Sequence, residues 1–138
     1  MATAPATLEF SAPSKSAKRT GWVLSGIVIA FLLMDATMKL MALPVVTQAS
    51  AALGWRDDAG TARALGALLL SITVLYTFRR TSVLGAILLT GYLGGAVATH
   101  ARIGSPLFTH ILFGVYLGVL AWGGLYLRNP KLRDLIAN

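Results

Sequence analysis

Residues 89–110 read LTGYLGGAVATHARIGSPLFTH and carry the clearest structural signal in the chain. An apolar, glycine-rich run reaches His100, a short polar turn follows, and a second apolar run starts at Leu107. A serine before a helix can accept a backbone N–H, and proline suits the first helical position. We therefore expect one membrane helix to end near His100, and the next to begin with Ser105 as its cap and Pro106 in its first turn.

The composition of the whole chain fits a protein built from such helices. Of 138 residues, 56% are hydrophobic and 12% are charged, and the mean hydropathy is +0.71. Soluble domains carry about 25% charged residues. The net charge of +7 does not indicate a nucleic-acid partner, because the Lys and Arg residues flank apolar runs and form no basic face. The chain has no cysteine, which excludes thiol–disulfide chemistry and cysteine-held iron–sulfur clusters.

The apolar runs predict an all-α, polytopic membrane protein, a four-transmembrane-helix bundle in contact with the lipid bilayer. We expect its helices at residues 22–43, 61–78, 81–100 and 107–127, with a short polar tail after the last. Residues 1–20 predict a disordered basic tail, followed by the four-helix domain at residues 21–138.

The connection after the first helix has features of its own. Pro44 should stop that helix. Val45, Ala49 and Leu53 share one helical face, which predicts a short amphipathic helix on the membrane surface. Gly54 would end this helix, because glycine tolerates the left-handed conformation found there.

Lys and Arg residues are distributed unevenly between the two ends of the predicted bundle. Eight lie in the N-terminal tail, the second connection and the C-terminus, and the opposite side carries Arg56, Arg63 and Arg102. The positive-inside rule then places both termini in the cytoplasm. We expect a multi-pass protein of the cell inner membrane, with Trp22 and Tyr76 among the aromatic anchors at the cytoplasmic interface.

This topology brings most ionisable residues of the spans into the outer half of the membrane. We expect a polar pocket near the outer face, formed by Asp35, Lys39, Tyr92, His100, Arg102 and His110. A charged side chain inside a bilayer costs about 2.5–3.5 kcal/mol on insertion scales. The i,i+4 spacing of Asp35 and Lys39 therefore predicts either a structural ion pair or a proton-handling site. Each histidine also has a structural interpretation, His100 as a helix cap and His110 as an interhelical hydrogen-bonding group.

Glycines recur at intervals of four residues on the last two helices. Gly91 with Gly95, and Gly114 with Gly118, predict faces on which membrane helices pack closely. The chemistry of the pocket disfavours a metal or a haem, because no spacing requires three ligands and the histidines flank one short turn. A quinone or a lipid head group needs only one or two donors above an apolar slot.

Three segments carry a similarity to a known family: residues 91–110, residues 124–134 and residues 34–40. Through them the chain resembles the DoxX-like family of small membrane proteins. The resemblance implies a four-helix membrane bundle. The family's namesake is a subunit of a thiosulfate:quinone oxidoreductase, and distant eukaryotic relatives act as receptor chaperones or sterol-associated proteins.

The function predicted from these features is that of a subunit or accessory of a quinone-linked membrane redox system, with other redox subunits as partners. The alternative is a non-enzymatic scaffold or assembly factor whose glycine faces bind partner helices or a second copy of the chain. The sequence assigns no catalytic residue and does not decide whether the protein is an enzyme. A small transporter is disfavoured, because neither a broken helix nor an inverted repeat is evident.

Overall fold

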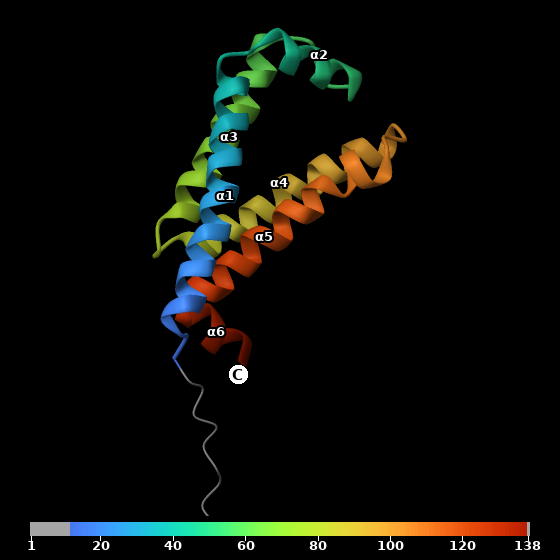
Figure 1. Cartoon of the computed structure of the whole chain (residues 1–138). Helices are drawn as coiled ribbons and strands as arrows, with labels where there is room; N and C mark the ends of the chain where they lie inside the picture. Colours follow the sequence, from blue (N-terminus) through green and yellow to red (C-terminus); the bar gives the residue numbers. More distant parts are fainter. Residues whose placement is uncertain (1–11, 138) are drawn as a thin grey trace, which may run out of the picture.

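The computed structural model describes residues 12–137, and these form helices without any strand. The elements are α1 (Lys15–Leu40), α2 (Pro44–Ala52), α3 (Ala59–Thr77), α4 (Ser82–Arg102), η1 (Leu107–Ile111), α5 (Phe113–Arg128) and α6 (Pro130–Ala137). In Figure 1, α1 and α3 run side by side, and α4 and α5 form a second pair. The two pairs meet near α6 and diverge toward α2, so that together they form a V.

Four helical segments in the described part of the chain are long and apolar enough to cross a membrane, which confirms the predicted all-α membrane architecture. The first of them starts earlier than expected. It begins at Lys15, where the Ser14 hydroxyl accepts a hydrogen bond from the Ala17 N–H, so the end of the predicted tail is helical. The predicted tail also covers residues 1–11, which lie outside the described residues.

The end of α1 differs from the prediction that Pro44 stops it. The helix ends at Leu40 because Ala42 adopts a left-handed conformation, with φ of 49°. The Leu43 N–H then bonds the Met38 carbonyl at 3.2 Å, which completes a Schellman motif. Pro44 instead occupies the first turn of α2, where its missing N–H costs nothing.

The start of the last membrane helix also differs from the prediction. Ser105 makes no capping bond, and Pro106 is the N-cap residue, outside the first turn. That turn is a π-helix, in which the Ile111 N–H bonds the Pro106 carbonyl at 3.2 Å. The expected polar tail at the C-terminus is helix α6, on which Leu132 is buried.

The two helix pairs meet through close contacts made by small residues. A Cβ atom added at Gly85 of α4 would lie 2.2 Å from the Tyr76 backbone nitrogen on α3. A Cβ atom added at Gly124 of α5 would lie 2.7 Å from the Ser25 hydroxyl on α1. These helices cross closely because the two glycines have no side chain. We call this crossing region the pivot, defined by Ser25, Tyr76, Gly85 and Gly124.

Polar groups are buried at the pivot, near the end of the bundle at which the sequence predicted interfacial aromatic residues. Tyr76 is fully buried, so its prediction as an interface anchor was wrong. Its hydroxyl donates to the Ala121 carbonyl at 2.7 Å and lies 3.0 Å from the Ser25 hydroxyl. Arg128 is only 5% exposed, donates to the Tyr76 carbonyl at 2.8 Å, and stacks over the rings of Trp22 and Tyr76. Hydrogen bonding and cation–π contacts offset part of the cost of burying these groups, while Arg128 Nε is buried without a hydrogen-bond partner among the described residues.

Candidate functional site

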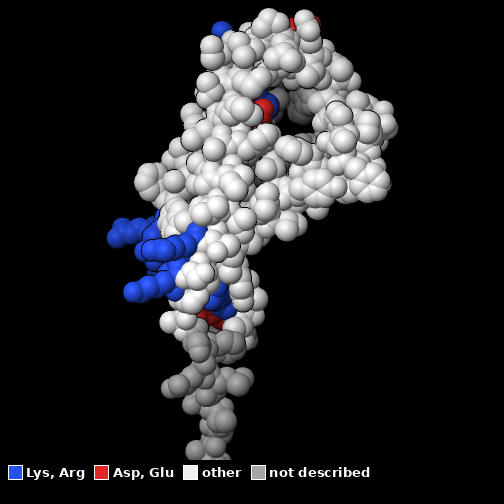
Figure 2. All heavy atoms as spheres, viewed as in Figure 1, with Lys and Arg blue, Asp and Glu red and all other residues white. Residues whose placement is uncertain are grey.

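A cavity of about 620 Å³ occupies the space between the diverging helix pairs. Figure 2 shows it as a hollow with an acidic and a basic side chain at its edge. Most of the residues that line it are apolar or small. They come mainly from α1, α2, α4 and α5, and Leu65 of α3, Trp55 and His110 complete the lining. The cavity is therefore an apolar slot that carries a few polar groups.

Helix α2 forms the end of the cavity opposite the pivot. Its Val45, Ala49 and Leu53, which the sequence placed on one helical face, all line the cavity. The predicted C-terminal glycine of this helix is confirmed, since Gly54 has φ of 83°. None of the residues of α2 is buried, so the helix rests on the bundle without being anchored in its core. Contact of α2 with the membrane surface remains a prediction.

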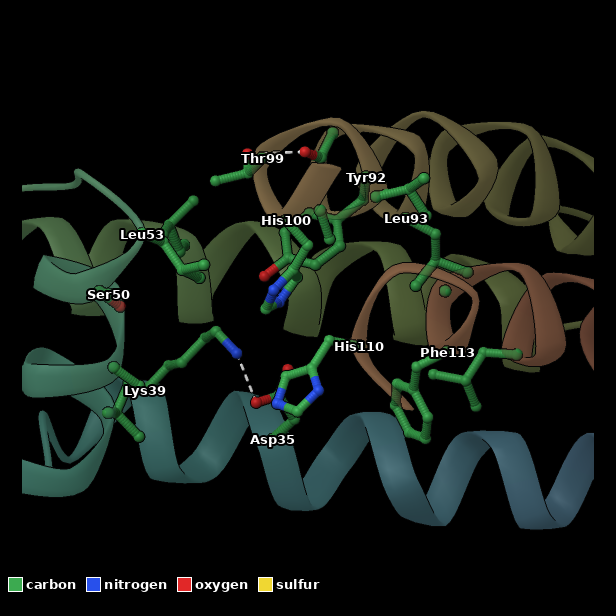
Figure 3. A pocket seen from close by; sticks show the side chains of 18 of the residues that line it. Asp35, Lys39, Ser50, Leu53, Tyr92, Leu93, Thr99, His100, His110 and Phe113 are labelled. Atoms are coloured by element: carbon green, nitrogen blue, oxygen red, sulfur yellow. Dashed lines mark hydrogen bonds and ion pairs between the residues drawn. The ribbon is translucent and has the colours of Figure 1, made fainter. Parts of the chain in front are cut away.

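Asp35 and Lys39 of α1 form an ion pair that faces the cavity, as Figure 3 shows. The pair follows from the i,i+4 spacing, which brings the ammonium to the carboxylate one turn away. The Lys39 side chain is 17% exposed and the Asp35 side chain 30% exposed. The two charges cancel, so the pair presents polar atoms to the cavity without a net charge.

The two histidines approach each other across the turn between α4 and η1. Their ring centroids are 5.5 Å apart and the rings are inclined by 60°. His100 Nδ1 lies 3.0 Å from the Ser105 hydroxyl, and His110 Nδ1 lies 2.8 Å from the Thr109 hydroxyl. These contacts orient both rings through Nδ1, which leaves Nε2 as the atom with which each ring can meet a ligand. The π-turn of η1 places His110 at the cavity, and such turns are frequent at functional sites.

The structure brings five of the six predicted pocket residues together. The cavity is lined by Asp35, Lys39, Tyr92, His100 and His110. Arg102 is not among the lining residues, and its guanidinium donates to the Leu53 carbonyl at 2.8 Å. That carbonyl belongs to the C-cap residue of α2, where a helix has unsatisfied acceptors that attract a cation. Ligand binding by the five lining residues remains a prediction.

The four predicted packing glycines behave differently from one another. A Cβ atom at Gly114 would lie 2.9 Å from a Val97 methyl group, so α5 does approach α4 closely there. A Cβ atom at Gly118 would make an ordinary contact of 3.9 Å. A Cβ atom added at Gly91 or Gly95 would meet no atom within 4 Å in the described chain, and both residues line the cavity. Their expected packing against a helix is therefore not made within this chain.

Two aromatic residues of the site were not predicted. Phe31 of α1 and Phe113 of α5 line the cavity and meet edge to face, with ring centroids 5.2 Å apart. Helical spacing could have indicated both residues, because positions three or four apart share a helix face. Phe31 is four residues before Asp35, and Phe113 is three residues after His110. The pair joins α1 to α5 beside the polar groups.

The described residues contain no cluster of three or more His, Cys, Asp or Glu side chains that could hold a metal ion. What they do contain is a bundle of membrane-crossing helices around a cavity with a small polar cluster. The protein is thus a multi-pass membrane protein of the four-helix class.

Within this class the chain belongs to the DoxX-like family, whose model matches residues 23–124. The match confirms the resemblance seen in the sequence and includes every polar residue that lines the cavity. No curated protein and no solved structure matches the chain significantly.

Proposed function

We propose that the cavity binds the head group of a quinone-like molecule dissolved in the bilayer, and that the protein is a subunit or accessory of a quinone-linked membrane redox system. One observation carries this proposal: polar groups from α1, α4 and η1 meet in a cavity that is otherwise apolar. Ligand sites of about 300–1,000 Å³ with a few convergent polar groups are typical of small-molecule binding.

The chemistry of the polar groups suits a neutral head group. Quinone carbonyl oxygens accept hydrogen bonds, and the Tyr92 hydroxyl and the imidazole N–H groups can donate them. The ion pair of Asp35 and Lys39 cancels its own charge, so the cavity offers no net charge to attract an anionic head group. Reduction of a quinone to a quinol takes up two electrons and two protons. In this proposal the electrons come from a partner subunit, and His100, His110 and Asp35 hold or pass the protons.

The distribution of charge supports a location in the inner membrane with both termini in the cytoplasm. Figure 2 shows Lys and Arg side chains gathered at the pivot end, where α1 begins, α3 turns into α4, and α6 lies. By the positive-inside rule this end faces the cytoplasm. The polar part of the cavity then lies toward the outer face, as the sequence predicts.

Binding can be tested through Trp55, which lines the cavity. In a variant with Trp22→Phe and Trp122→Phe, Trp55 is the remaining tryptophan. We expect decylubiquinone to quench its fluorescence saturably in detergent micelles, and His110→Leu to raise the half-saturating concentration about tenfold, as loss of one hydrogen bond of about 1.4 kcal/mol requires.

A matched pair of tyrosines provides the control. Tyr92→Phe removes a hydroxyl from the cavity, whereas Tyr116→Phe removes one from an exposed position on α5 outside it. Tyr92→Phe should weaken quenching, and Tyr116→Phe should leave it unchanged. Quenching that rises linearly with decylubiquinone concentration, or that is the same with and without His110→Leu, contradicts the proposal.

The alternative function as a scaffold or assembly factor has one observation in its favour. Gly91, Gly94 and Gly95 leave an open face on α4, where a helix of another protein or of a second copy could approach closely. This function predicts that Gly94→Leu disrupts a complex isolated from native membranes while His110→Leu preserves it. The redox function predicts that His110→Leu weakens quinone binding about tenfold in an assembled complex.

A further inference from the structure

The cavity is closed at both ends along the direction of the helices. At one end lies the pivot, where backbones touch and where a Cβ atom at Gly85 or Gly124 would have no room. At the other end lies α2, whose Val45, Val46, Ala49 and Ser50 line the cavity together with its C-cap residue Leu53. Because the helices cross the membrane, these two ends face the two aqueous sides.

The position of α2 depends on a connection to α4. Since α2 contributes no buried residue, few apolar contacts hold it in place. Arg102 at the end of α4 reaches across and donates to the Leu53 carbonyl at the end of α2. We call this hydrogen bond the latch. Gly54 makes room for it, because a Cβ atom there would lie 2.6 Å from Arg102 Nη2.

The cavity is open on the side that Figure 2 shows. Figure 2 shows the hollow on the lateral surface, bordered by α1, by α2 and by the ends of α4 and α5. On α4, the open positions at Gly91 and Gly95 form part of its wall. Beside the latch, Ile103 at the end of α4 and Leu107 and Phe108 at the start of η1 are exposed, Phe108 by 72%. Exposure of these apolar side chains is favourable in lipid and unfavourable in water.

From these features we infer that the cavity is reached from the bilayer through the side of the bundle, and that Arg102 latches α2 as a roof that separates the polar groups from water. The inference deepens and rests on the proposed function, since it restricts the ligand to a molecule that partitions into lipid. Arg102 is a positioning residue in this arrangement, and it acts on the site through α2.

The natural absence of cysteine permits a direct test by thiol labelling. Ala96→Cys places one thiol in the cavity wall. Proteoliposomes of phosphatidylcholine and phosphatidylglycerol are treated either with lipophilic N-(1-pyrenyl)maleimide or with a charged, membrane-impermeant methanethiosulfonate. We expect the lipophilic reagent to label Ala96→Cys and the charged reagent to leave it unlabelled. Asp57→Cys, in the exposed loop before α3, should react with the charged reagent.

Breaking the latch should change only access from water. Arg102→Gln should raise the rate of labelling by the charged reagent about tenfold, and Gly54→Ala should do the same by displacing the guanidinium. Arg63→Gln is the matched control, because Arg63 also donates to a carbonyl at a helix end, that of Leu40, but does not reach α2. Its labelling should equal that of Ala96→Cys alone. Circular dichroism and gel filtration verify that each variant is folded.

Two results would overturn the inference: labelling of Ala96→Cys by the charged reagent with the latch intact, or unchanged labelling in both Arg102→Gln and Gly54→Ala. Neither readout requires a ligand. A separate measurement asks whether decylubiquinone protects Ala96→Cys from the lipophilic reagent. Failure of protection with the expected labelling pattern refutes the proposed quinone site and leaves lateral access standing.

Discussion

Substitution of Gly85 by alanine tests whether the pivot holds the two helix pairs together. The added Cβ atom would lie 2.2 Å from the Tyr76 nitrogen, 2.5 Å from its Cα atom and 2.7 Å from the Leu75 carbonyl carbon. These are backbone atoms of α3, which cannot turn aside as a side chain can. To reach an ordinary contact distance of about 3.5 Å, α3 and α4 must separate by about 1.3 Å at their crossing.

The expected cost follows from two opposing effects. Overpacking of a tight contact costs about 1–3 kcal/mol, and the backbone contact places Gly85→Ala at the upper limit of about 3 kcal/mol. Alanine in place of glycine inside a helix stabilises the folded state by about 1 kcal/mol. The net loss in the free energy of unfolding is about 2 kcal/mol. Gly94→Ala, on the same helix with open space around it, keeps only the gain of about 1 kcal/mol.

The assay is unfolding by sodium dodecyl sulfate in mixed micelles, followed by circular dichroism. The two variants should differ by about 3 kcal/mol, which is more than a hundredfold in the unfolding equilibrium constant. If Gly85→Ala is as stable as Gly94→Ala, the close crossing of α3 and α4 is not a feature of the folded protein, and the pivot must be rejected.

Three further changes should have measurable effects on stability. Lys39→Met leaves Asp35 unpaired and should lower the free energy of unfolding by about 3 kcal/mol, whereas the double variant with Asp35→Leu should recover it in the same assay. Arg128→Lys keeps the charge but loses the planar stack and should cost about 2 kcal/mol, with a change in tryptophan fluorescence. The Thr61 backbone N–H holds the pKa of Asp58 below its usual 3.8. Asp58 therefore stabilises the fold fully above that value, and the difference in melting temperature between the wild type and Asp58→Ala should shrink as the pH falls below 3.8.

Local spacing predicted much of the site, because neighbours along one helix meet regardless of the rest of the fold. The i,i+4 pair of Asp35 and Lys39 and the proximity of His100 and His110 across one turn are of this kind. The contact of Arg102 with Leu53 joins residues that are 49 positions apart, and no pattern in the sequence indicates it. The charge of Arg102 and its place at a helix end are compatible with a ligand-binding role and with a structural role equally well.

The same distinction explains the fold. Apolar runs predicted four membrane helices, because hydropathy and length are local properties. Which glycines make close helix contacts depends on how the helices cross. The spacing of four residues on both α4 and α5 did not indicate which glycines these would be. Gly85 and Gly124, where the helices of the pivot cross closely, stand outside the predicted rows, whereas Gly91 and Gly95 line open space. Burial of Tyr76 also depends on the crossing, since its hydroxyl finds its hydrogen-bond partners, the Ala121 carbonyl and the Ser25 hydroxyl, where α1, α3 and α5 meet.

The pivot makes the α4–α5 hairpin a lever. At 1.5 Å per residue, His100 lies about 22 Å along α4 from Gly85. A rotation of about 5° at Gly85 therefore moves His100 by about 2 Å, enough to make or break a hydrogen bond to a ligand. A larger side chain at the closed end of the V therefore causes a small rotation there, and this rotation produces a larger displacement at the open end. Ligand affinity should respond to substitutions that lie far from the cavity and touch none of its walls.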